Sequence, residues 1–490
     1  MTKKSKSPHP LWATKQRTPG TELRLIRGNY YLYEYKTIYD KERKKPRKIT
    51  GKLIGSIDQR VGLIPSGKRQ LEKTLEEKIF SNIQCREYGM SFLVANKFAV
   101  YSNSLKKAFG DSWTSILAIA YCRLVHRCPL KNIPFRLAQS YLPEMLNLKA
   151  FNENTSSFIL KTIGSQQDQM LSYMKSFIHK GEYMLMDATN IFSNSNQISL
   201  SKKGYSNPLN FDPQFNLLYI YSADSHMPVY YRLLPGNIRE VKAFKNSLIE
   251  AGLKRAVIIA DKGFYSKDNI EMLEKEKLKY VIPLKRDNTL INYDAISKNT
   301  FKQKNLFFEH EGRIIWYRKY RVNNKQNLFV YLDESLRLKE ERDYLKRIST
   351  HPENYTMEGY HQKRNVFGTV ALFTSLIRMD AIEIYQTYKS RNSIEVMFDG
   401  MKNVLEADHT YMQDEQTLKG WMFINHIALQ WYQSLYLELK GKGLLKKYSV
   451  NDYIQILTDI KKIKINGDWH FNEVTSYTQK LVKKIGIEVV

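Results

Sequence analysis

The sequence predicts a mixed α/β fold in which a central sheet is flanked by helical regions. Three observations support this prediction. Helical periodicity gives way to apolar strand-like segments near residue 182, and amphipathic helices alternate with strands beyond that point. The chain also has 42% hydrophobic residues in a length of 490. A chain of this size can bury a large core and is long enough for more than one domain.

The charge balance indicates the class of partner. Lys and Arg number 77 against 49 Asp and Glu, a formal net charge of +28, and the first 60 residues hold 16 basic and 5 acidic residues. An excess spread along the whole chain favours nucleic acid over a membrane surface. No apolar run is long enough to span a bilayer, and the N-terminus lacks the apolar core of a signal peptide. We therefore expect a cytoplasmic, nucleoid-associated protein without a membrane partner.

Cysteine usage predicts a reducing compartment. The chain has three cysteines, Cys85, Cys122 and Cys128, and His126 stands between the last two. A zinc site is one interpretation of that cluster. No second ligand pair follows at zinc-finger spacing, so buried free thiols are the favoured interpretation.

The N-terminal part of the chain divides into three predicted regions. Residues 1–20 are rich in Lys, Ser and Pro and are expected to form a basic flexible tail. Residues 21–60 predict a basic β-hairpin region, because aromatic and β-branched residues flank a basic loop. Such a hairpin suits a nucleic-acid backbone, and an ordinary solvated turn is the alternative. Residues 61–180, beginning with a helix over 68–80, predict a helical DNA-binding region in which no feature identifies a recognition helix.

Strands and helices then follow in an informative order. The segments "EYMLMDATNIF", "FNLLYIYSAD" and "MPVYYRLLPGN" predict three adjacent strands, which are followed by helix, strand, helix and strand. This is the order of an RNase H-like mixed sheet. We expect that catalytic domain to comprise residues 181–286 and 381–435. A β-rich insertion over 287–380 would interrupt it, and a C-terminal helical region would cover 436–490.

Acidic residues stand where such a sheet would gather them. Asp187 and Asp261 are each expected to end an apolar strand, and Glu395 lies on a helix predicted over 381–405. A charged residue at a strand end is, by itself, most simply a cap. An RNase H-like fold would bring all three to one edge of the sheet, where like charges repel unless cations neutralise them. Hard oxygen ligands suit Mg²⁺ or Mn²⁺, and two such ions can clamp both oxygens of a phosphoryl transfer.

The predicted helix also carries a polar stripe. Tyr388, Arg391, Glu395 and Lys402 fall within an arc of roughly 60° on an α-helix. Asp399 lies on the same stripe and is expected to support the metal ligands from outside or to form a salt bridge, rather than to bind a metal itself. Alone, the stripe is most simply a solvated face with i,i+4 pairs. Beside two aspartates it could grip phosphate, through the fork of an arginine and the point charge of a lysine.

The spacing Tyr-x2-Arg-x3-Glu-x6-Lys resembles the YREK signature of DDE insertion-sequence transposases of the insertion-sequence-four-like family. "MLMDATNIF" and "VIIADKGFYSKDNI" resemble that family's two aspartate strands, and "LLPGN" stands between them, over about residues 180–435. The resemblance implies a catalytic and metal-binding triad with two Mg²⁺ or Mn²⁺ ions per active site, formed by Asp187, Asp261 and Glu395. It also implies that phosphates are held by Tyr388, Arg391 and Lys402.

The resemblance further implies a function. Such an enzyme binds the terminal inverted repeats of its element, cleaves the ends and joins their 3′-hydroxyls to target DNA, as a homodimer in a synaptic complex. Some relatives stack a flipped base on a tryptophan of the insertion, a role that would fall to Trp316. An ordinary strand or core tryptophan is an equal alternative at that position.

Three other functions remain open from the sequence. A tyrosine recombinase is suggested by the HxxR pattern from His361 to Arg364, with Tyr388 or Tyr411 as the nucleophile. The strand-rich segment before this pattern does not suit an all-helical catalytic domain. A non-catalytic DNA-binding regulator derived from a transposase is disfavoured by the intact carboxylates. An RNase H-like nuclease without strand transfer is disfavoured only by the basic N-terminal region and the long C-terminal helices.

Overall fold

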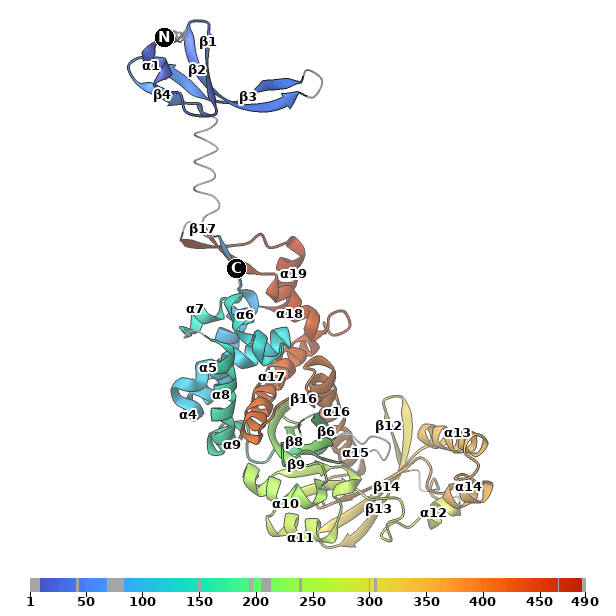
Figure 1. The fold of residues 1–490 in the computed structure, drawn as a ribbon. Coiled ribbons are helices and arrows are strands. Elements are labelled where there is room, and N and C mark those ends of the chain that lie inside the picture. Colours follow the sequence, from blue (N-terminus) through green and yellow to red (C-terminus); the bar gives the residue numbers. More distant parts are fainter. Residues whose placement is uncertain are drawn as a thin grey trace. The chain divides into compact units, whose positions relative to one another are not determined.

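The computed structural model describes most of the chain: residues 9–40, 44–67, 83–148, 151–193, 195, 197–203, 213–237, 240–298, 300–303, 306–465 and 467–486. The helix predicted over 68–80 lies outside these residues, as do the first eight residues of the expected basic tail. The chain forms two units, Met1–Cys85 with Lys462–Phe471, and Arg86–Lys461 with Asn472–Val490. Figure 1 shows the helices and strands of both units.

The first unit contains a four-stranded antiparallel sheet. Its strands are β1 (Thr21–Ile26), β2 (Asn29–Asp40), β3 (Lys45–Asp58) and β4 (Gly62–Pro65), in the order β1-β2-β3-β4. A short helix, α1 (Leu11–Thr14), precedes the sheet. The structure thus extends the expected hairpin into a sheet. A smaller sheet has the order β18-β17-β5, from Asp468–Phe471, Lys461–Ile465 and Gln84–Glu87.

Helices form one part of the second unit. Those before the sheet are α3 (Gly89–Phe92), the π-helix η1 (Leu93–Lys97), α4 (Ala99–Phe109), α5 (Trp113–His126), α6 (Ile133–Ala138), α7 (Leu142–Leu146), α8 (Glu153–Ser165) and α9 (Gln167–Lys175). Those after it are α17 (Glu415–Gly441), α18 (Val450–Thr458) and α19 (Ser476–Ile485). None of the helices in the described part of the chain is long and apolar enough to cross a membrane.

Helix α17 is the central helix of this helical part, because it is buried along most of its length and packs on α5 and α8. Glycines allow α8 and α17 to approach closely. A Cβ on Gly420 would lie 2.0 Å from the carbonyl oxygen of Leu160, and one on Gly164 would lie 1.7 Å from that of Gln416. The two backbones therefore touch where the helices cross, and only glycine fits there.

A sheet of eleven strands forms the rest of the second unit. Its central strands are β6 (Tyr183–Ser193), β8 (Pro213–Ser222), β9 (Met227–Pro235), β10 (Val257–Ala260) and β11 (Lys279–Pro283). They are arranged as β9-β8-β6-β10-β11, in which β8 is antiparallel to β6 and β9, while β10 is parallel to β6 and β11. Three sequential antiparallel strands followed by two parallel ones form an RNase H-like sheet, so the predicted fold class is confirmed.

Helices cover this sheet. Helix α10 (Glu240–Ala251) packs on β9 and α11 (Lys267–Lys275) on β11, while α15 (Ala381–Lys389) packs on β11 and α16 (Asn392–Asp399) on β6. In Figure 1, α10 and α11 lie below the green strands and α17 above them. Burial on both faces explains the apolar composition of β8 and β10, which are buried along almost their whole length.

The strands of the expected insertion continue the same sheet. They are β12 (Phe307–His310), β13 (Arg313–Asn323), β14 (Gln326–Asp333) and β15 (Thr369–Thr374), and β15 pairs with both β14 and β11. Helices α12 (Asp294–Ser297), α13 (Glu334–Thr350) and α14 (Met357–Lys363) belong to this region. The short strands β7 (Lys202–Lys203) and β16 (His409–Thr410) pair with β8 and β6.

Candidate active site

Asp187 and Asp261 lie on neighbouring parallel strands. Met186 of β6 pairs with Ala260 of β10, so the two aspartates are the next residues along the two chains. Neighbouring strands lie about 4.8 Å apart, and residues in register on parallel strands share a face. The register therefore brings the two carboxylates to the same place at the sheet.

The strand of Asp187 does not end at that residue. The expectation that it would was wrong, since β6 continues to Ser193 by pairing with β8 beyond Asp187. The strand of Asp261 does end at Ala260. The Asp187 carboxylate accepts a hydrogen bond of 2.9 Å from the backbone N–H of Ala188, which helps to fix its orientation.

The predicted helix over 381–405 consists of three segments. After α15 ends at Lys389, the N–H of Arg391 donates to the carbonyl of Tyr388 in a tight i,i+3 turn, and α16 follows. The last segment is the π-helix η5 (Gly400–Val404). The prediction of one uninterrupted α-helix was therefore wrong, because a tight turn and a wide turn replace regular α-helical ones.

The guanidinium of Arg391 lies among three carboxylates. Its Nη1 is 3.2 Å from Oδ1 of Asp261 and 3.8 Å from Oδ2 of Asp187, and its Nη2 donates to Oε1 of Glu395 at 2.7 Å. The Arg391 side chain is only 16% exposed. Its buried Nη1 has no hydrogen-bond partner among the described residues, so it is held there by charge attraction alone. Strands β6 and β10 and helix α16 thus converge on one positive group.

Burial and neighbouring charges both shift the pKa values of the groups in this cluster. Burial raises the pKa of Asp187, and the charges of Asp261 and Glu395 add to that effect, while Arg391 opposes it. Burial lowers the pKa of Arg391, but the neighbouring carboxylates outweigh burial and the net pKa is raised. Burial also raises the pKa of Tyr388, so its hydroxyl stays protonated and can donate a hydrogen bond.

The donor set of this cluster is chemically suited to a divalent ion. Within the part of the chain that the structure describes, no three His, Cys, Asp or Glu side chains converge closely enough to hold a metal. The three carboxylates surround Arg391 instead. Their hard oxygens are the ligands that Mg²⁺ and Mn²⁺ prefer, and the space between them already holds a cation with one unsatisfied nitrogen. A divalent ion would therefore fit here in competition with Arg391 for the same oxygens.

A cavity of about 450 Å³ opens beside Asp261. Its lining includes three basic side chains, Lys262, Lys285 and Arg286, together with the ring of Tyr388. The basic side chains of this wall can hold the phosphates of a nucleic-acid strand. The bond to be cleaved would then face the neighbouring carboxylates.

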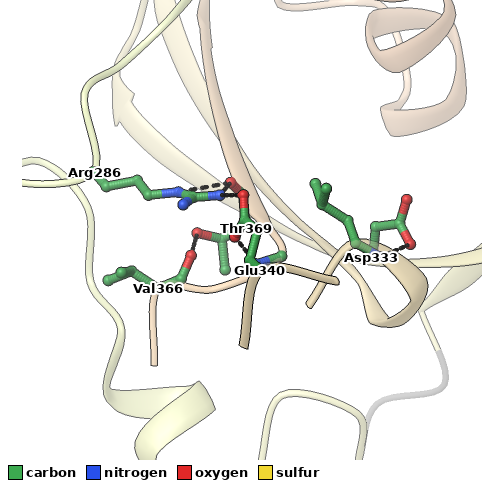
Figure 2. Close-up of polar contacts among 7 residues, drawn as sticks. Arg286, Asp333, Glu340, Val366 and Thr369 are labelled. Atoms are coloured by element: carbon green, nitrogen blue, oxygen red, sulfur yellow. Dashed lines mark hydrogen bonds and ion pairs between the residues drawn. The ribbon is translucent and has the colours of Figure 1, made fainter. Parts of the chain in front are cut away.

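Arg286 is fixed in the wall of this cavity, as Figure 2 shows. Its Nε and Nη2 donate to the carbonyl of Thr369 at 3.2 and 3.0 Å, and Nη2 also donates to Oε1 of Glu340 at 2.9 Å. The other oxygen of Glu340 accepts from the N–H of Gly368 at 2.7 Å. The Thr369 hydroxyl donates to the carbonyl of Val366 at 2.6 Å. These bonds join the loop after β11 to β15 and α13 and hold the wall in one conformation.

Two other residues predicted for DNA contact lie in different surroundings. Lys402 is on the π-helix η5, and in the described structure it forms no ion pair. Burial lowers its pKa against the opposing charge of Asp408. Trp316 is half-buried on β13, with its ring 5.1 Å from that of Phe307 and the ammonium of Lys302 over it at 5.4 Å. The contacts of Trp316 are thus within the insertion.

Asp399, the fifth residue of the predicted stripe, is exposed and accepts a hydrogen bond of 2.6 Å from the side chain of Asn403. It forms no ion pair with a described residue. The salt bridge, one of the two roles expected for Asp399, is therefore absent from the described structure.

The cysteines do not form a metal site. Cys122 and Cys128 are buried free thiols, as expected, whereas Cys85 is exposed, which corrects the expectation for that residue. Burial lowers the pKa of His126 to about 4, so this histidine is neutral. No metal-binding group of three such side chains occurs in the described ranges.

His361 and Arg364 of the recombinase alternative are not among the groups that act electrostatically on Tyr388. His361 and Arg364 are exposed on or next to α14, and Tyr411 is 69% exposed. The charged groups that act on Tyr388 are Arg391 and the three carboxylates.

Arg123 supports the site and was not singled out from the sequence. It is 4% exposed on α5, and it donates to Oδ1 of Asn425 at 3.1 Å and to the carbonyl of Leu405 at 2.5 Å. Its guanidinium also lies 4.6 Å from the ring of Trp421. Arg123 therefore connects α5 and α17 of the helical part to Leu405, at the end of the segment on which Glu395 lies. The available signal was an arginine inside the otherwise apolar run "AIAYCRLV".

Comparisons with known proteins identify one matching family and similar solved structures. The family described as "Transposase DDE domain" matches residues 179–431, just over half of the chain. The comparison with curated proteins gives no match. A synaptic complex of piggyBac transposase with hairpin DNA is similar over 74% of this chain and 70% of that chain, at 11% identity and a TM-score of 0.37.

The Mos1 transposase paired-end complex with the left transposon end is similar over 32% of this chain and 54% of that chain, at 15% identity and a TM-score of 0.15. Both TM-scores are below 0.5, so the family assignment rests on the sequence match. That match contains Asp187, Asp261 and Glu395, the three carboxylates around Arg391. The chain therefore belongs to the transposase DDE domain family.

Proposed function

We propose that this chain is a DNA transposase of the YREK type, with Asp187, Asp261 and Glu395 as its catalytic triad. The observation that supports this proposal most strongly is the gathering of carboxylates from β6, β10 and α16 around one guanidinium. Carboxylates on three separate elements, one of them buried enough to have a raised pKa, indicate a functional site more than a structural ion pair.

The three carboxylates would hold two Mg²⁺ or Mn²⁺ ions. When bound, the ions supply Lewis-acid activation of the attacking water or 3′-hydroxyl and neutralise charge at the leaving oxygen. Once Arg391 leaves the carboxylates, its planar fork can bind two oxygens of one phosphate. The protonated hydroxyl of Tyr388 can donate to another phosphate oxygen, and the basic cavity wall can hold the strand beyond it.

The substrate is proposed to be duplex DNA. The enzyme would bind the terminal inverted repeats of its own element, cleave the ends and join their 3′-hydroxyls to target DNA, acting as a homodimer in a synaptic complex. DNA contacts are proposed for the helical region 61–180, for Lys402 and for Trp316. Location in the cytoplasm with the nucleoid follows from this substrate.

Cleavage of a labelled DNA carrying the element's inverted repeat tests the proposal. Glu395→Gln removes one carboxylate charge and keeps the shape of the side chain. We expect it to lower cleavage in Mg²⁺ by about a hundredfold or more, because a metal ligand contributes several kcal/mol to the transition state. DNA binding should persist.

Asp399→Asn is the matched control. Asp399 lies one helical turn away, is exposed and accepts a hydrogen bond from Asn403, so cleavage should be retained. Equal cleavage by wild type and Glu395→Gln would contradict the triad. A covalent 3′-phosphotyrosyl product that is lost in Tyr388→Phe or Tyr411→Phe would instead establish the recombinase mechanism.

A further inference from the structure

The hairpin of the first unit extends beyond its sheet. Strand β1 pairs with β2 only as far as Glu34, and β4 pairs with β3 only from Gly55 onward. Strands β2 and β3 continue to pair up to Asp40 and Lys45. Residues 36–40 and 45–49, called here the outer ribbon, therefore form two strands with no third strand beside them among the described residues. Figure 1 shows this ribbon projecting from its sheet.

Both faces of the outer ribbon are exposed. Every one of its ten residues except Asp40 is exposed, including Ile38 at 50%, Tyr39 at 64% and Ile49 at 44%. A two-stranded hairpin without a packed face is at best marginally stable in water. The first unit therefore presents an extended surface that its own described core does not use.

One face of the ribbon gathers positive charge. Lys36 pairs with Ile49, Ile38 with Arg47 and Asp40 with Lys45. Alternate residues on a strand and directly opposed residues on its neighbour share a face. Lys36, Lys45 and Arg47 therefore point to the same side.

Asp40 is the acidic residue of this face and lies directly opposite Lys45. Lys36, Lys45 and Arg47 form no ion pair with any described residue. The ten residues of the outer ribbon include four Lys and Arg against one Asp. This narrow, two-stranded element thus has a net charge of +3, and it matches a polyanion in charge.

The shape of the ribbon favours one polyanion. The major groove of B-form DNA is about 12 Å wide and 8.5 Å deep and admits a two-stranded ribbon, whereas the minor groove is only about 6 Å wide. The deep major groove of A-form RNA is too narrow for side chains to read. We propose that the outer ribbon enters the major groove of duplex DNA, with Lys36, Lys45 and Arg47 bound to phosphates. This inference depends on the proposed function and assigns part of its DNA contact to the first unit.

DNA binding by the full chain tests the inference. The triple variant Lys36→Ala/Lys45→Ala/Arg47→Ala is compared with wild type by fluorescence anisotropy on a labelled 20-base-pair duplex, in EDTA so that no cleavage occurs. Each phosphate contact contributes about 0.9 to the slope of log K against log [salt]. The slope should therefore become shallower by ~2.7, and affinity at 0.1 M salt should fall by about eightfold for each phosphate that the variant no longer binds.

The matched control removes the same charge elsewhere. Lys254, Lys275 and Lys279 are exposed and lie at or before the N-terminal ends of β10 and β11, opposite the edge that holds Asp261. Their triple alanine variant should keep the wild-type slope to within about one contact, or about 0.9. Circular dichroism should show that both triple variants are folded, because all six substituted side chains are exposed.

A ribbon variant that binds DNA as the control does would overturn the inference. The inference would also be overturned if the ribbon variant lost as much affinity for a 20-base-pair RNA duplex as for the DNA duplex. The same holds if the variant bound DNA normally and lost binding only to vesicles containing phosphatidylserine. None of these outcomes affects the triad, which Glu395→Gln tests by cleavage. Conversely, weaker DNA binding by the ribbon variant, with no effect of Glu395→Gln on cleavage, would support the ribbon and contradict the triad.

Discussion

Removal of Arg391 should tighten the binding of divalent metal. The guanidinium lies 2.7 to 3.8 Å from the three carboxylates that would ligate the ion. Arg391→Ala abolishes this competitor and leaves three negative groups facing one another. The variant should therefore bind Mg²⁺ or Mn²⁺ more tightly while losing the arginine's contact with phosphate.

The expected size follows from the geometry. At these distances and an effective dielectric constant of ~20, each gross Coulomb attraction is about 4 to 6 kcal/mol. Most of this is offset by desolvation and by repulsion among the carboxylates, and Glu395 is 55% exposed and strongly screened. Hydrogen bonds to charged groups retain about 1.5 to 3 kcal/mol. Because the ion must displace Arg391 in the wild type, the wild type should bind Mg²⁺ or Mn²⁺ about ten- to a hundredfold more weakly than Arg391→Ala does.

Isothermal titration with Mn²⁺, in the absence of DNA, measures this difference directly. Arg232→Ala is the control, because Arg232 forms a comparable ion pair of 2.7 Å with Glu250 and does not contact the three carboxylates. Thermal unfolding provides a second reading, since Mg²⁺ should raise the Tm of Arg391→Ala more than that of wild type. Unchanged or weaker Mn²⁺ binding by Arg391→Ala would show that the guanidinium and the ion do not share these oxygens.

Two further predictions concern stability. Burial raises the pKa of Glu87 in the folded protein from 4.5 to about 7. The folded state is therefore stabilised by the protonated carboxyl. This contribution to the free energy of unfolding is complete below pH 4.5 and is lost as pH rises through 7. The loss should be ~3 kcal/mol, seen as a pH-dependent difference in urea unfolding between wild type and Glu87→Gln, and a constant difference from pH 4.5 to 8 would refute it. Gly420→Ala should destabilise by about 2 kcal/mol or more, because its Cβ would meet the carbonyl of Leu160. Gly441→Ala, on the same helix with open space, should be near neutral in the same urea measurement, and equal midpoints for the two variants would contradict the close crossing of α8 and α17.

Local patterns in the sequence were sufficient to predict the fold class. Apolar runs such as "VIIA" can be buried on both faces only inside a sheet covered by helices, and their order in the chain restricts how that sheet can be connected. The spacing of Tyr388, Arg391 and Glu395 likewise suggested a shared helix face. In the structure the side chains of Arg391 and Glu395 do pair, through a contact between neighbouring turns.

Local sequence patterns could not predict which distant strands pair or where a helix departs from regular α-helical geometry. Strand β6 continues past Asp187 because β8 is long enough to pair with it. The π-turn at Gly400–Val404, which carries Lys402, has no distinctive residue pattern. Strand β15 joins the insertion to the central sheet because it pairs with β14 and β11, which lie far apart in the sequence.

The sequence by itself determined the order of strands and helices, the net charge and the residue types available for catalysis, since these depend on composition and short-range periodicity. Only the tertiary structure decided that Arg391 lies among Asp187, Asp261 and Glu395. It also decided that a basic cavity opens beside them. Both depend on strand register and helix packing between segments up to about two hundred residues apart, which no local pattern encodes.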